Sequence, residues 1–174
     1  MFLTESIVKV SAIFLLVVSI PVSSLSQKRI MWEPVEITKR DLFWGPGGSL
    51  MQPVMKKLQY IGRQPGGNNP KHRIRDGAGQ EWVVKIARES QPETAAVRLL
   101  WGVGYKTEIN YLMPKLSIIG IGNYRNVRFE ARPDNVKRLD RWSWTGNPFS
   151  GTSEFEGLKI MMAMFNNWDL KDEN

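Results

Sequence analysis

Three side chains near the end of the chain have types and a spacing that suit one kind of chemistry. Asp169, Lys171 and Asn174 lie in the segment DLKDEN. A carboxylate can accept the proton of a substrate hydroxyl, an ammonium group can steady a transferring phosphate, and an amide oxygen can bind magnesium. We therefore expect Asp169 and Lys171 to be catalytic residues and Asn174 to be a metal ligand. The plainer interpretation of this short motif is a solvated, polar helix end.

Lys85 is a candidate for binding an anion. It lies in the segment WVVKIA, in which side chains on both faces of a strand would be apolar. Such a strand should be covered on both sides, and an ammonium group between Val83 and Ala87 would then need a partner or a bound anion. The alternative is a lysine on an exposed edge strand.

Glu93 is a candidate partner for that lysine. It heads a helical stripe of apolar residues that we expect to face the core. The same carboxylate could instead complete a capping box with Ser90, and this cap is the interpretation that we favour. Glu89 and Glu108 are then the remaining candidate partners for Lys85.

A glycine-rich segment, QPGGNNP, lies between the first two predicted strands. Backbone amides freed by Gly66 and Gly67 could bind phosphate. Taken alone, this segment is more typical of an ordinary hairpin turn.

The elements that must position these residues follow from periodicity and turn signals. A tight turn, GAGQ, separates the second and third strands, and a helix follows the third. A second helix should begin with a Ser153–Glu156 capping box and be buried, because it is apolar all round. We predict an α+β fold with strands at 55–63, 71–76, 81–87, 105–113 and 124–131, and helices at 90–104 and 152–168.

The N-terminal segment is typical of a targeting signal. Residues 1–26 combine a short apolar stretch with Ser24 and Ser26 before a plausible cleavage point, which predicts a secretory signal peptide and an exported protein. If the segment is not cleaved it would anchor the protein; after cleavage we expect no membrane span. Residues 27–54 should form an extended lead-in that lays Trp32, Phe43 and Trp44 onto the domain.

Composition excludes several kinds of site. The chain has no cysteine, so disulfides, thiol nucleophiles and cysteine zinc sites are excluded. Its single histidine, His72, lies in a basic segment and is expected on the surface. The net charge of +7 comes mostly from residues 27–76. This could attract phosphates, anionic lipid or an envelope polymer, but no motif predicts nucleic acid as a partner.

The order of these features resembles the protein-kinase-like fold over residues 55–174. The segment WVVKIA matches the pattern V-A-I-K, and DLKDEN resembles the catalytic loop, although Asn167 and Trp168 replace the usual histidine-arginine pair. The glycine loop is not G-x-G-x-x-G. The chain is more similar to the atypical, HipA-like, lipid-kinase-like or secreted relatives than to ordinary protein kinases. It also resembles uncharacterised exported bacterial proteins.

The resemblance implies a five-stranded antiparallel N-terminal lobe with one helix at 55–134. Residues 135–174 would then form a connection, a buried helix and a truncated C-terminal lobe. It implies ATP with its phosphates on Lys85, a Glu93 partner for that lysine, Mg²⁺, and transfer to a hydroxyl acceptor. Because the family's second metal carboxylate follows the catalytic loop, we expect this polypeptide to be inactive.

The alternative is a non-catalytic exported domain that binds an anionic glycan, an envelope polymer or a protein partner. The basic N-terminal third and the aromatic pair Trp142 and Trp144 would then form the binding surface.

Overall fold

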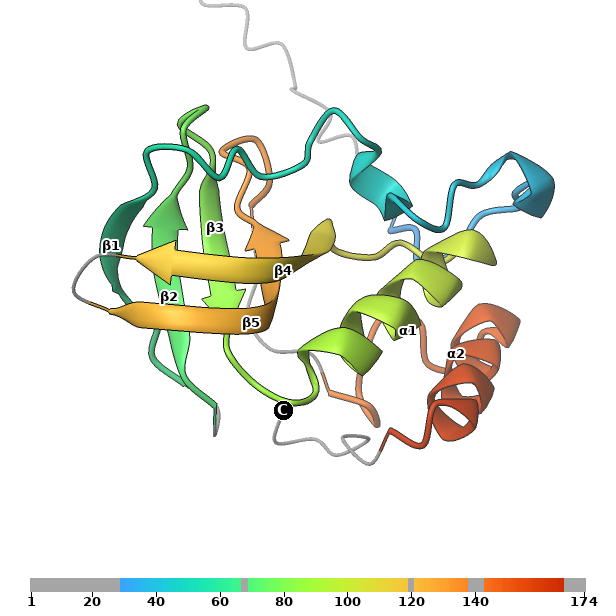
Figure 1. Cartoon of the computed structure of the whole chain (residues 1–174). Coiled ribbons are helices and arrows are strands. Elements are labelled where there is room, and N and C mark those ends of the chain that lie inside the picture. The colour runs from blue at the N-terminus through green and yellow to red at the C-terminus, as the bar shows by residue number, and fades with distance from the viewer. Residues whose placement is uncertain (1–28, 67–68, 119–120, 138–142, 168–174) are drawn as a thin grey trace, which may run out of the picture.

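A computed structural model describes residues 29–66, 69–118, 121–137 and 143–167. In these ranges the fold is α+β, with one open five-stranded antiparallel sheet and two α-helices (Figure 1). This confirms the predicted fold class. The strands are β1 (Gln59–Arg63), β2 (Lys71–Arg75), β3 (Glu81–Lys85), β4 (Asn110–Ile118) and β5 (Gly122–Ala131), and the helices are α1 (Ser90–Gly102) and α2 (Ser153–Met164).

The strand order is β1-β2-β3-β5-β4, so β3 lies in the middle of the sheet. Its register pairs Lys85 with Lys71 of β2 on one side and with Arg128 of β5 on the other. Residues directly opposite each other in an antiparallel pair share a face of the sheet. Pro114 lies in β4, which is an edge strand and therefore tolerates a residue without an N–H group.

The main core lies on the face of the sheet opposite to Lys85. The sheet is strongly curled, and the β4–β5 hairpin crosses in front of β2 and β3 (Figure 1). Trp82 is at the centre of this core, with its ring edge-on to Tyr111 at 5.9 Å and to Phe129 at 6.0 Å between centroids. Alternation of apolar residues along β3 and β5 produces this face, and the lead-in residues Trp44 and Met51 cover part of it.

The turn between β2 and β3 is organised by a buried carboxylate. Asp76 is 5% exposed and accepts four hydrogen bonds. Oδ1 accepts from the backbone N–H groups of Ala78 at 2.9 Å and Gln80 at 3.0 Å. Oδ2 accepts from the Val54 backbone at 3.0 Å and from the Trp82 indole at 3.1 Å. One side chain therefore ties the predicted turn to the lead-in and to the main core.

The lead-in accounts for the error in the predicted fourth strand, which begins at Asn110 instead of residue 105. Tyr105 forms a bridge with Trp32, and the Lys106 backbone N–H donates to the Met31 carbonyl at 2.9 Å. Residues 105 and 106 thus pair with the lead-in before the chain joins the sheet. Trp32 packs on the domain as expected, whereas the prediction for Phe43 was wrong, because that side chain is 70% exposed.

Helix α2 is half-buried, which corrects the prediction that it would be buried on all sides. Phe155 and Leu158 pack into a second core with Leu100 and Tyr105. On the other face Ile160 is 62% exposed and Met164 is 73% exposed. The helix packs against its neighbours through one face only, so apolar composition all round does not ensure burial. Neither helix in the described ranges has the length and apolarity that crossing a membrane requires.

Both predicted capping boxes are wrong. Thr152, one residue earlier than predicted, caps α2 by accepting a hydrogen bond from the Phe155 backbone N–H at 3.2 Å. At α1 the capping position is Glu89, which makes no side-chain cap, and Ser90 is the first helical residue. Glu93 is consequently free to interact elsewhere.

We predict that Asp76→Ala lowers the free energy of unfolding by on the order of 3 kcal/mol, because four donors lose their acceptor in or near the core. Urea unfolding followed by tryptophan fluorescence measures this. Asp134→Ala removes an exposed carboxylate and is the matched control, with an expected change below about 0.5 kcal/mol. Equal effects of the two substitutions would contradict the role given to Asp76.

Candidate functional site

Lys85 is a buried cation at the end of the central strand. It is 8% exposed, and Trp82, Val83 and Val84 before it are also buried. Because β3 is flanked by β2 and β5, the alternative of an exposed edge strand is wrong. The expectation of a strand covered on both sides is confirmed. The ammonium group of Lys85 must therefore be neutralised by nearby groups.

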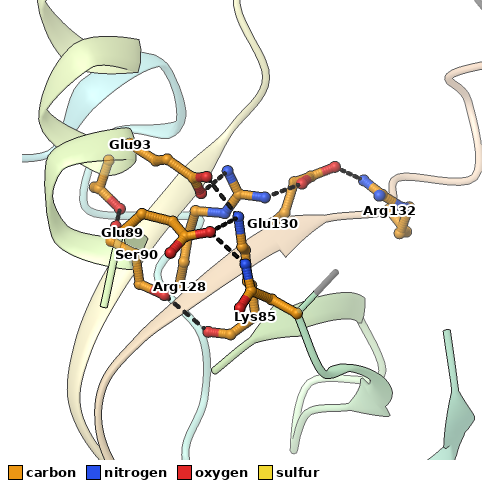
Figure 2. A network of polar contacts seen from close by, with 9 residues as sticks. Lys85, Glu89, Ser90, Glu93, Arg128, Glu130 and Arg132 are labelled. Carbon is orange, nitrogen blue, oxygen red and sulfur yellow. Dashed lines mark hydrogen bonds and ion pairs between the residues drawn. The ribbon is translucent and has the colours of Figure 1, made fainter. Parts of the chain in front are cut away.

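Two carboxylates from the start of α1 neutralise it. The Nζ atom of Lys85 lies 2.5 Å from Oε1 of Glu93 and 3.1 Å from Oε1 of Glu89 (Figure 2). The Lys85 ammonium also lowers the pKa of Glu89. Glu93 thus pairs with the lysine instead of capping the helix, so the favoured sequence interpretation was wrong and its alternative is what the structure has.

Ser90 explains why the helix begins in this way. Its hydroxyl is fully buried and donates to the Lys85 carbonyl at 3.1 Å, so it does not cap the helix. This bond fastens the first turn of α1 to the end of β3. Glu93 lies one turn after Glu89, so both carboxylates face the lysine.

The network continues along β5, which sequence reasoning did not find. Arg128 Nη1 contacts Oε2 of Glu93 at 2.8 Å, and its Nη2 contacts Oε2 of Glu130 at 2.9 Å. Arg132 pairs with the other oxygen of Glu130 (Figure 2). The segment RFEAR could have predicted this part of the network. Its charged residues alternate with apolar ones, so they must share one face of a strand.

Glu130 is the most perturbed carboxylate of this network. Burial raises its pKa, but a hydrogen bond with Glu108 and the charges of Arg132 and Arg128 outweigh burial and bring the pKa down to about 2. The ordinary value is 4.5, so the carboxylate stays ionised over the whole physiological range. Glu108, a candidate partner for Lys85, interacts here with Glu130.

A hollow of about 420 Å³ lies beside the described part of the glycine loop. Its lining residues are Arg63, Gln64, Pro65, Gly66 and Asn69. The Asn69 amide donates to the Glu89 carboxylate, which connects the hollow to the Lys85 ion pairs. Gly66 has a φ of +90°, a conformation that favours glycine. The volume is within the range of small-ligand sites.

Four predicted site residues lie outside the described residues: Gly67, Asp169, Lys171 and Asn174. Trp142 does too, whereas Trp144 stacks on Phe155 at 5.8 Å between ring centroids and belongs to the second core. Among the described residues, no three His, Asp or Glu side chains are grouped so as to hold a metal ion.

We predict that Glu130→Gln lowers the free energy of unfolding at pH 7 by about 3 kcal/mol, because Arg128 and Arg132 lose a buried counter-charge. The folded-state pKa is depressed, so the carboxylate's contribution is complete above about pH 4.5 and is lost as the pH falls towards 2. The difference between variant and wild type should shrink over that window.

Urea unfolding at a series of pH values tests this expectation. Glu36→Gln, which removes an exposed carboxylate paired with Lys39, should cost less than about 1 kcal/mol at every pH. A penalty for Glu130→Gln that is independent of pH between 2 and 5 would contradict the assignment.

Comparisons with protein-family models, with curated proteins and with solved structures found no match for this chain. An α+β fold by itself does not indicate an activity, because one fold hosts many functions. The site must therefore be interpreted from its own geometry and charges.

Proposed function

We propose that this chain is a kinase-like phosphate-binding protein in which Lys85 holds the phosphates of a nucleotide. The observation that carries the proposal is the buried ion pair between Lys85 on the third strand and Glu93 on the following helix, at 2.5 Å. In kinases a lysine of the third strand pairs with a glutamate of the next helix and contacts the nucleotide phosphates.

Three further features support the proposal. The ammonium group of Lys85 is buried and held by ion pairs with Glu93 and Glu89. The neighbouring hollow has the volume to accept a small ligand. The glycine loop follows β1 and its Gly66 lines the hollow, where a backbone amide of the loop would be available to a phosphate.

The remaining parts of the proposal concern residues outside the described ranges. Asp169 would orient or deprotonate a hydroxyl acceptor, Lys171 would steady charge on the phosphate, and Asn174 would bind magnesium. Gly67 would add an amide to the phosphate site. The protein would carry out this binding outside the cytoplasm, since residues 1–26 have the pattern of a signal peptide.

We predict that the chain binds ATP in the presence of Mg²⁺ and that Lys85→Met weakens this binding at least about tenfold, because a charge-assisted contact is lost. Isothermal titration calorimetry measures both affinities. Lys106→Met removes an exposed lysine that pairs with Glu33 and should leave the affinity unchanged. Lys85→Arg retains the charge and should bind with intermediate affinity.

Equal affinity in wild type and Lys85→Met, with both proteins folded by near-UV circular dichroism, would reject the proposal. Binding of an anionic glycan that weakens with salt and ignores nucleotide would favour a non-catalytic binding domain instead.

A further inference from the structure

Three cations form a row across the middle of the sheet. Lys71 of β2, Lys85 of β3 and Arg128 of β5 are directly opposite each other in register. They therefore share one face, the face on which α1 brings Glu89 and Glu93. We call these three residues the cation row.

The carboxylates near the cation row already form ion pairs. Glu89 pairs with Lys85, Glu93 bridges Lys85 and Arg128, and Glu130 is shared between Arg128 and Arg132. In the described part of the chain no carboxylate forms an ion pair with Lys71. Like charges placed directly opposite each other destabilise a sheet, with Cβ atoms only about 5 Å apart. Among the described residues, the positive charge of Lys71 is thus left without a carboxylate partner.

Lys71 is also next to the hollow beside the glycine loop. Its carbonyl accepts a hydrogen bond from the Gln64 backbone N–H at 2.9 Å, and Gln64 lines that hollow. On the other side, the Pro70 carbonyl accepts from the backbone N–H of Ile86, the residue after Lys85, at 3.2 Å. The backbone at Lys71 consequently lies between Gln64, which lines the hollow, and the end of the strand that carries Lys85.

We propose that Lys71 is a second phosphate-binding residue, and that the ligand carries at least two linked phosphates. An anion beside Lys71 supplies the missing negative charge and relieves the repulsion from Lys85. A single phosphate pairs with Lys71 alone, whereas a chain of phosphates reaches from Lys71 to Lys85 and gains from both charges. This inference rests on the proposed function for Lys85, and it adds a residue and a ligand class.

The test is titration of the full chain with inorganic tripolyphosphate, with orthophosphate and with ATP, at constant ionic strength. We expect tripolyphosphate to bind more tightly than orthophosphate, and Lys71→Met to raise the Kd for tripolyphosphate about tenfold. Lys115→Met, an exposed lysine on the edge strand β4, should leave the Kd unchanged. The ligand-free melting temperature of Lys71→Met should equal or exceed that of wild type, because a like-charge contact is removed.

The outcomes separate this inference from the proposed function. Wild-type affinity for tripolyphosphate in Lys71→Met, with ATP binding still dependent on Lys85, overturns the role of Lys71 and leaves the proposed function standing. Loss of tripolyphosphate binding in Lys71→Met, with ATP no tighter than tripolyphosphate, supports the inference and removes the case for a nucleotide. Failure of the wild type to bind any of the three ligands overturns both, and a lower ligand-free melting temperature in Lys71→Met assigns that residue a structural role instead.

Discussion

Burial of one ammonium group is the constraint on which the site depends. Lys85 ends a central strand, and the residues paired with it on both neighbouring strands are cations, so these residues cannot neutralise its charge. The neutralising carboxylates must come from outside it, and they come from the first turns of α1. The need to neutralise Lys85 explains where the helix begins. It also explains why Ser90 does not cap the helix and why Glu93 points towards Lys85.

The ion pairs that neutralise Lys85 also connect distant parts of the chain. Glu93 uses its second oxygen to contact Arg128, which contacts Glu130 in turn, so the start of α1 is connected to both β3 and β5. Breaking a buried ion pair by removing one partner costs much more than the pair itself contributes, because a charge is left unpaired. We therefore regard the network as a rigid frame for Lys85, positioned beside the hollow at the glycine loop.

Local sequence patterns predicted most of the fold and part of the site. The apolar run WVVKIA identified β3, and the GAGQ turn before it and the helix after it were found in the right order. Burial of Lys85 followed from its apolar neighbours on both faces.

The predictions that failed concerned features that depend on tertiary partners. Residues 105 and 106 pair with the lead-in, α2 has only one covered face, and Glu93 binds a lysine eight positions away in preference to capping. The cation row could not be predicted, because only the register between strands brings Lys71 and Arg128 beside Lys85.

A double-mutant cycle between Lys85 and Glu93 tests the central claim most directly. The free energies of unfolding would be measured for wild type, Lys85→Met, Glu93→Gln and the double variant. The account predicts a coupling free energy above about 1 kcal/mol, since the two groups are in contact and largely removed from water. Additive effects, with a coupling free energy near zero, would show that the pair does not organise the site and would contradict the account.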